Sequence, residues 1–164
     1  MKVEFCYDVE TNQKGNKSLT ITGIEGGVSS NITELNIPEK INVDGEEIKV
    51  TEIGDNAFEG CDSLISIKIP SSVTNIGCDA FEDCTSLISI NIPSNVIRLG
   101  QCAFAGCKNV LVSCEIDREP ENWDEGWNWL DKDKIIYEED EDGNVWGIED
   151  YDGDYVNVVW KKCK

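Results

Sequence analysis

The cysteines are the residues of this chain whose type and spacing could do chemistry. Three of them, Cys61, Cys84 and Cys107, stand 23 residues apart. Equal spacing predicts one stacked column of small, buried, reduced side chains, as suits a reducing compartment. Three equivalent residues also make an awkward disulfide framework. Cys78 and Cys102 belong to neighbouring copies and differ by one position within the repeat, so a diagonal disulfide between them is conceivable but not favoured. For the column of Cys61, Cys84 and Cys107, our interpretation is packing.

Catalysis and zinc binding have little support in the composition. The chain contains no histidine, so the usual base for a serine or cysteine nucleophile is missing. It also has no Cys-x-x-Cys pair, the usual spacing of zinc ligands. We therefore predict a noncatalytic protein with no cofactor and no metal site.

One segment resembles a calcium-binding loop. Counted from Glu138, acidic residues occupy loop positions 1, 3, 5 and 12, and Gly143 occupies position 6. Position 1 is normally aspartate, and the flanks have the pattern of strands rather than helices. Asp142-Gly143 is equally well explained as a hairpin turn, which we favour. A true calcium loop and weak nonspecific cation binding by Asp150, Asp152 and Asp154 stay open as alternatives.

The charge of the chain is strongly acidic and unevenly distributed. It has 33 acidic and 14 basic residues, for a net charge of −19. Residues 115–154 hold 17 of the acids against three bases. Such a potential repels nucleic acids and anionic membranes, so we expect no direct contact with either and predict a basic protein partner. The candidate partner-binding run is Glu138, Glu139, Asp140, Glu141 and Asp142.

All five tryptophans follow Cys114. We expect Trp123, Trp127 and Trp160 to plug the open end of a core. Trp129 and Trp146 are the better candidates for exposure, and tryptophan is enriched at interface hot spots.

A repeat must position these residues. Copies begin at Val50, Val73 and Val96 within residues 50–116, and the first two read Val-x-x-Ile-Gly-x-x-Ala-Phe-x-x-Cys-x-x-Leu-x-x-Ile-x-Ile-Pro. Fixed apolar positions at a short period indicate units that bury their core face jointly by stacking. The fold class we predict is a mainly β solenoid with 23-residue coils.

Each coil is expected to contain one short strand and one brief helical turn. Apolar residues of 64–69 and 87–92 face inward, and a proline ends each strand. The helical turn carries the Ala-Phe pair, and Gly60, Asp83 and Gly106 close it in the left-handed conformation. Outward positions on the concave strand face, a candidate binding surface, are predicted to be Ser66, Lys68, Ser89, Asn91, Val112 and Cys114.

The two ends of the chain are expected to cover the solenoid within a single domain, 1–164. Residues 1–49 would form an N-terminal cap from a hairpin over 1–27, a half coil over 32–38, and an inserted hairpin turning at Asp44-Gly45. Residues 117–164 would form an acidic, tryptophan-rich C-terminal cap. Its apolar runs at 135–137, 145–148 and 155–160 predict an antiparallel meander.

The repeat unit resembles the BspA-like leucine-rich repeats. Residues 19–23 resemble the entry strand of those domains. The segments 113–115 and 120–128, with Trp123 and Trp127, look like their closing segment, so the likeness covers about residues 19–128. The resemblance implies a surface or secreted binding protein of bacteria or protozoa, often an adhesin, without catalytic activity.

Two functional hypotheses follow. The first is a noncatalytic protein–protein interaction module with a basic partner. The alternative is an intracellular inhibitor, of the kind that phages encode, which mimics nucleic acid to block a nucleic-acid-binding or defence protein; a cell-surface adhesin fragment is less favoured. The start of the sequence lacks the apolar core of a signal peptide. The expected location is therefore cytoplasmic, or cell-surface or secreted if a leader was trimmed.

Overall fold

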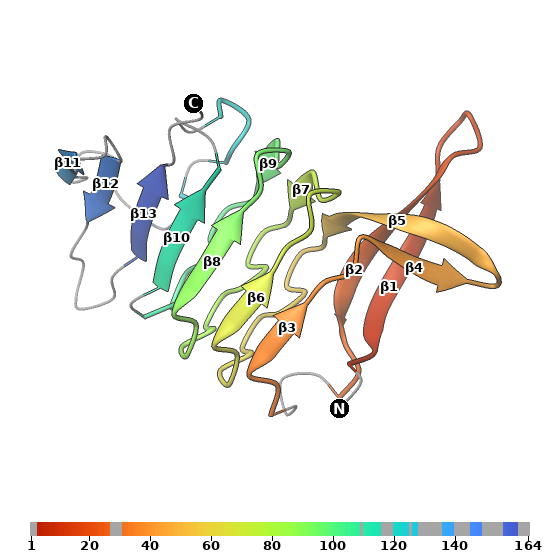
Figure 1. Cartoon of the computed structure of the whole chain (residues 1–164), viewed down its shortest axis with the longest axis horizontal. Coiled ribbons are helices and arrows are strands. Elements are labelled where there is room, and N and C mark those ends of the chain that lie inside the picture. Colours follow the sequence, from red (N-terminus) through yellow and green to blue (C-terminus); the bar gives the residue numbers. More distant parts are fainter. Residues whose placement is uncertain are drawn as a thin grey trace.

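The computed structural model describes residues 3–26, 31–108, 110–115, 120–124 and 126–127, together with the backbone of three later strands. Two sheets make up the described part of the chain, which contains no helix (Figure 1). The first sheet, in the order β1-β2-β5-β7-β9 with β4 on β5, consists of β1 (Phe5–Thr11), β2 (Lys17–Ile24), β4 (Lys40–Val43), β5 (Glu46–Ile53), β7 (Asn75–Ile76) and β9 (Arg98–Leu99). The second sheet, in the order β11-β12-β13-β10-β8-β6-β3, consists of β3 (Glu34–Asn36), β6 (Ser66–Lys68), β8 (Ser89–Ile92), β10 (Val110–Cys114), β11 (Ile136–Glu139), β12 (Val145–Ile148) and β13 (Val156–Trp160).

The chain passes back and forth between the two sheets, and each passage lies beside the one before (Figure 1). Parallel pairing joins Ser66 to Ser89 in the second sheet and Asn75 to Arg98 in the first. Both pairs are 23 positions apart, so equivalent residues of successive passages become neighbours. In contrast, Leu35 pairs with Ile67 at a larger separation, because the β4–β5 hairpin is inserted between them.

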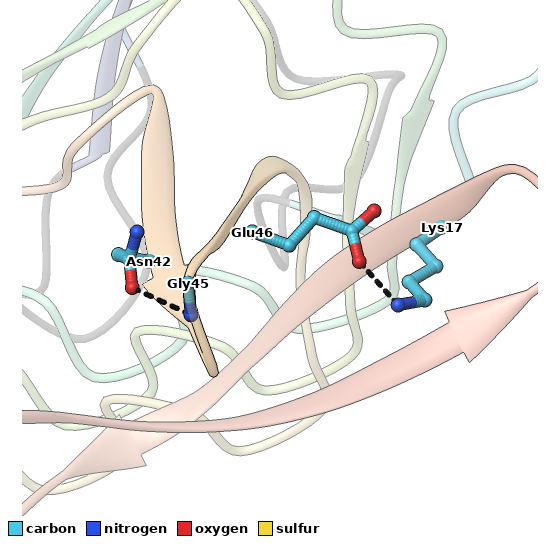
Figure 2. Close-up of polar contacts among 4 residues, drawn as sticks. All are labelled: Lys17, Asn42, Gly45 and Glu46. Atoms are coloured by element: carbon cyan, nitrogen blue, oxygen red, sulfur yellow. Dashed lines mark hydrogen bonds and ion pairs between the residues drawn. The ribbon is translucent and has the colours of Figure 1, made fainter.

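Both N-terminal hairpins that the sequence predicts are present. Strands β1 and β2 pair antiparallel, and β2 also pairs parallel with β5, so the hairpin extends the first sheet. In the β4–β5 hairpin, Asp44 (φ 52°) and Gly45 (φ 89°) are both left-handed, as a type I′ turn requires. Figure 2 shows how the tip is held: Gly45 N donates to Asn42 Oδ1 at 3.1 Å, and Lys17 forms an ion pair with Glu46.

The core lies between the two sheets and is built from stacked columns. The rings of Phe58, Phe81 and Phe104 stack in series with centroids 5.4 Å apart at each step. Trp127 then meets Phe104 edge-on at 6.1 Å, and Trp123 meets Trp127 at 5.1 Å. All five rings are buried, each worth about 1.5–3 kcal/mol or more in removed apolar surface. The predicted burial of Trp123 and Trp127 is therefore confirmed, whereas the side chain of Trp160 lies outside the described residues.

The Ala-Phe segments are not helical, contrary to the prediction. Their N–H groups alternate between two kinds of partner. Phe58 N donates to Ala80 O of the next passage at 2.9 Å, and Gly60 N likewise donates to Glu82 O at 2.8 Å. The intervening N–H groups donate three residues back, as Glu59 N does to Asn56 O. A helix cannot form because every second backbone N–H group is hydrogen-bonded to a carbonyl of the neighbouring passage.

The column of cysteines packs as predicted. Cys84 and Cys107 are buried, and their Sγ atoms donate to the carbonyls of Phe58 (3.2 Å) and Phe81 (3.0 Å). Cys61 is only half-buried, because no earlier passage covers it. All the cysteines in the described part of the chain are unbridged. The column is therefore a packing feature of the core.

Left-handed backbone occurs at the predicted closing positions and at a second set. Gly60 (φ 67°), Asp83 (φ 56°) and Gly106 (φ 71°) confirm the prediction. The second set, which sequence reasoning missed, lies just before each Ala-Phe pair: Asn56 (φ 57°), Asp79 (φ 54°) and Cys102 (φ 55°). Asn and Asp tolerate this conformation better than Cys does, so the signal existed in two of the three copies.

The prediction that Val112 and Cys114 point outward is wrong. Both are completely buried, and they pair with the buried Ile90 and Ile92. Leu111 and Ser113 occupy the outward positions instead. The reason is a shorter spacing in the third copy. The first inward strand residue comes three positions after the repeated leucine in the first two copies (Leu64, Leu87), but two positions after its counterpart Val110 in the third. Every later residue of this strand therefore faces the side opposite to the one predicted.

Candidate binding surface

The outer face of the second sheet gathers the four predicted strand residues. Register places Ser66 beside Ser89, and Lys68 beside Asn91. Strand β10 extends the two columns with Leu111 next to Ser89 and Ser113 next to Asn91. On the other side, β3 extends them with Glu34 and Asn36. The result is a surface of small and polar side chains, which we call the strand face: Glu34, Asn36, Ser66, Lys68, Ser89, Asn91, Leu111 and Ser113.

A row of aliphatic side chains borders the strand face. Ile65, Ile88 and Leu111, the aliphatic ladder, are joined by the hydrogen bonds Ile88 N to Ile65 O (3.0 Å) and Leu111 N to Ile88 O (2.9 Å). Ile65 is 41% exposed and Ile88 63% exposed. Sequence reasoning missed this row, although its signal is visible: the position after the leucine column is aliphatic in all three copies. A contiguous exposed apolar row is typical of an interaction site.

Two polar atoms within the strand face have no hydrogen-bond partner. Asn91 Nδ2 donates to Glu115 Oε1 at 2.7 Å, and the other carboxylate oxygen of Glu115 accepts from Ser94 N at 3.3 Å. Asn91 Oδ1 and Ser113 Oγ, however, are buried and unpaired. Because these residues are neighbours across β8 and β10, the two atoms belong to one spot. Leaving each such group unpaired costs the folded state about 1–3 kcal/mol.

The turns carry a separate concentration of acidic side chains. The pKa of Glu82 is raised, first by partial burial and then by the nearby charges of Asp79, Asp83 and Glu59. The pKa of the Cys102 thiol is also raised, mainly by burial and then by Asp79 and Glu82. Mutual repulsion of this kind favours a basic group nearby. In the described residues, however, no group of three or more Cys, Asp or Glu side chains is placed to hold a metal ion.

A small apolar hollow of about 10 Å³ lies at the N-terminal end of the core, between Ile24, Ile32, Leu35, Phe58, Cys61 and Leu64. This volume is below the roughly 300–1,000 Å³ of pockets for drug-sized ligands. Burial raises the pKa of the Cys61 thiol to about 11, with smaller contributions from Cys84 and Asp62. The hollow therefore lacks both the room and the reactive thiolate of a small-molecule site.

The side chains of the other predicted partner-binding residues lie outside the described part of the chain. Trp129, Asp140, Glu141 and Asp142 lie outside the described residues. Glu138, Glu139 and Trp146 belong to β11 and β12, of which only the backbone is described. The antiparallel pairing of β11 with β12 and of β12 with β13 agrees with the predicted meander, and β13 joins β10 in parallel. The side chains of the alternative calcium-binding loop, which begins at Glu138, also lie outside the described part of the chain.

Comparison with known proteins identifies the family. Residues 28–125 match the family described as "BspA type Leucine rich repeat region (6 copies)", which is more than half of the chain. The chain belongs to the BspA-type leucine-rich repeat family. The likeness seen in the repeat motif is thereby confirmed, and the fold is a leucine-rich repeat fold. Leucine-rich repeat proteins are generally noncatalytic.

Two solved members of such proteins are similar in structure. One is a leucine-rich repeat protein from Bacteroides ovatus, 34% identical, with a TM-score of 0.55, over 70% of this chain and 30% of that chain. Another is a leucine-rich cell surface protein from Faecalibacterium prausnitzii, 31% identical, with a TM-score of 0.54, over 65% of this chain and 28% of that chain. This BspA-type chain thus spans less than a third of either relative. No curated protein matches the sequence.

Proposed function

We propose that this BspA-type protein is a noncatalytic module that binds another protein through its strand face. Its architecture would be a short solenoid of 23-residue coils, with the N-terminal hairpins as one cap and the C-terminal strands as the other. The observation that supports this function best is the exposed aliphatic ladder beside the strand face, in which Ile65 is 41% and Ile88 63% exposed. A partner that covers the ladder would bury this apolar surface.

The partner that suits this protein is basic. The net charge of −19 favours association with a positively charged surface and opposes contact with nucleic acids or anionic membranes. Lys68 is the only base among the strand-face residues, and it lies between Asn36 and Asn91 in the sheet. In the part of the chain that the structure describes, no helix is long and apolar enough to span a bilayer.

The same charge supports a second candidate, an intracellular inhibitor that presents carboxylates where a nucleic acid would present phosphates. The mutually repelling acids around Glu82 favour this candidate. The Faecalibacterium relative is a cell surface protein, and a surface role with an adhesin-like partner is the third candidate. The three differ in partner, location and salt dependence.

A capture experiment with matched variants separates these candidates. The protein would be immobilised and exposed to a lysate of the cells that make it, as wild type, as Ile88→Lys and as Ile97→Lys. Ile97 is 58% exposed, much like Ile88, but lies beside β9 of the first sheet, so its variant is the control. We expect Ile88→Lys to lose the partner and Ile97→Lys to keep it.

The outcomes that would contradict this proposal come from the variants and from the salt dependence of capture. A partner retained by Ile88→Lys would refute the strand face as the binding surface. If that partner is a nucleic-acid-handling protein released near about 0.5 M salt, where the Debye length shrinks to a few ångströms, the inhibitor is favoured instead. Retention at that salt concentration of ligands from the cell surface would favour the surface role.

A further inference from the structure

Strand β1 leaves one edge of the first sheet open. The sheet runs in the order β1-β2-β5-β7-β9, and no other described strand pairs with the outer side of β1 (Figure 1). At seven residues, Phe5–Thr11 is long for an edge strand. All of these residues except Phe5 are exposed. Such an edge offers a row of backbone donors and acceptors to another chain.

The register identifies the backbone groups on this open edge. Asn12 N donates to Asn16 O at the turn of the hairpin, and hydrogen-bonded and non-hydrogen-bonded pairs then alternate along antiparallel strands. Glu10 and Asp8 are therefore bonded to β2, whereas Thr11, Val9 and Tyr7 face the non-bonded positions. The N–H and C=O groups of these three residues consequently point away from β2, toward the open edge.

The side chains of β1 present a different chemistry on each face of the strand. Val9 and Tyr7 stand opposite Leu19 and Ile21, which are completely buried. Val9 is nevertheless 40% exposed and Tyr7 37% exposed, so the apolar face of the sheet continues one strand beyond the core. The other face of β1 carries the carboxylates of Asp8 and Glu10.

The charge of β1 excludes a second copy of the chain as the occupant. Residues 3–11 contain Glu4, Asp8 and Glu10 and no basic residue. Antiparallel pairing of β1 with itself would bring these acids close to one another in every register, and like charges on facing strands are destabilising. A strand that carries lysine or arginine opposite these carboxylates would instead gain from them.

We propose that β1 is a docking edge for an extended segment of a partner protein in which basic residues alternate with aliphatic ones. The segment adds a strand to the first sheet through the backbone of Tyr7, Val9 and Thr11. Its aliphatic side chains cover Tyr7 and Val9, and its basic side chains lie against Asp8 and Glu10. In this mode the backbone bonds provide affinity and the alternation of side chains provides specificity. This surface is distinct from the strand face.

A synthetic octapeptide of alternating lysine and valine tests the proposal, with a block peptide of four lysines followed by four valines as the control ligand. We expect the alternating peptide to bind at least about tenfold more tightly than the block peptide. Amide hydrogen exchange followed by NMR should show new protection at Tyr7, Val9 and Thr11. Protection elsewhere, or equal affinity for the two peptides, would overturn the proposal.

Variants of β1 keep the test independent of folding. Val9→Pro removes one outward N–H without touching the bonds to β2, as suits proline on an edge strand, and should weaken the alternating peptide by about tenfold or more. Glu10→Lys leaves the backbone intact and, because Asp8 then faces a lysine of the same strand, should remove most of the preference for the lysine peptide over a peptide of alternating glutamate and valine. Ile88→Lys should leave the affinity for both alternating peptides unchanged. Failure of the docking edge is therefore distinguishable from failure of the strand-face function. Unchanged binding by both β1 variants would refute the docking edge.

Discussion

The spacing between successive passages of the chain can be tested at one repeated glycine. Gly54, Gly77 and Gly100 hold the same position in the three copies, and none has a left-handed φ. A Cβ at Gly77 would lie 2.5 Å from Asp55 N and 2.7 Å from Gly54 C, and a Cβ at Gly100 would lie 2.4 Å from Cys78 N. Close approach of the neighbouring backbone therefore requires glycine at the two inner positions.

The first copy differs from the other two and provides a matched control. A Cβ at Gly54 would come no closer than 3.2 Å to Ile21 O and the Thr20 methyl group. A shift of a few tenths of an ångström relieves that contact. At Gly77, by contrast, the passages would have to separate and stretch bonds such as Gly77 N to Ile53 O, 2.8 Å long.

We expect Gly77→Ala and Gly100→Ala each to lower the free energy of unfolding by about 2 kcal/mol or more. Overpacking against rigid neighbours costs about 1–3 kcal/mol, and a stretched backbone hydrogen bond adds about 0.5–1.5 kcal/mol. The reduced entropy of the unfolded chain returns only about 0.4–1 kcal/mol. For Gly54→Ala the terms nearly cancel, and we expect a change within about 1 kcal/mol of zero.

Urea unfolding followed by tryptophan fluorescence and by circular dichroism measures these differences. At about 2–4 °C per kcal/mol for a chain of this size, the inner variants should melt about 4–8 °C below the Gly54→Ala variant. Equal stability of all three variants would show that the passages are not held at the distance seen here. It would also undermine the stacked columns that depend on that distance.

Two further predictions concern titratable groups. At pH 8, iodoacetamide should label Cys61 about 100-fold more slowly than an ordinary thiol, because the pKa of Cys61 is near 11 rather than 9.0. Mass spectrometry should find the exposed Cys6 modified first. Equal labelling rates for the two cysteines would contradict the burial of Cys61. The raised pKa of Glu82 means that the native state holds this proton more tightly than the unfolded state. Protonated Glu82 therefore stabilises the folded state at low pH, and this stabilisation is lost as the pH rises from the ordinary carboxyl pKa through the raised pKa. The melting temperature of Glu82→Gln should match wild type near pH 4 and exceed it at pH 7, less so in high salt; a difference independent of pH would contradict the repulsion.

Features of the fold that depend on local chemistry were predictable from the sequence. Asp44-Gly45 specifies its type I′ turn because both residues tolerate a left-handed backbone. The Phe58 and Cys84 columns were predictable because identical residues recur at one period. The helical turns were predicted wrongly because the bonds that replace a helix, such as Phe58 N to Ala80 O, join residues far apart in sequence. No local pattern carries that information.

The candidate surface was predicted only in part. Ser66 and Ser89 were expected on the strand face because polar residues alternate there with isoleucines. Ile65 and Ile88 were missed because an aliphatic residue next to a core leucine is ordinarily interpreted as core. Their exposure depends on how the chain bends into each strand, which becomes visible only in three dimensions.

The one-residue offset in the third passage explains why the candidate site lies where it does. With the spacing of the first two copies, the positions beside Ser89 and Asn91 would have been Val112 and Cys114. The offset turns those residues into the core and brings Leu111 beside Ser89, where it continues the aliphatic ladder onto the sheet. It also places Ser113 beside Asn91, which creates the pair of unsatisfied polar atoms. The ladder itself recurs with the repeat, whereas its extension onto the sheet by Leu111 arises where the period fails.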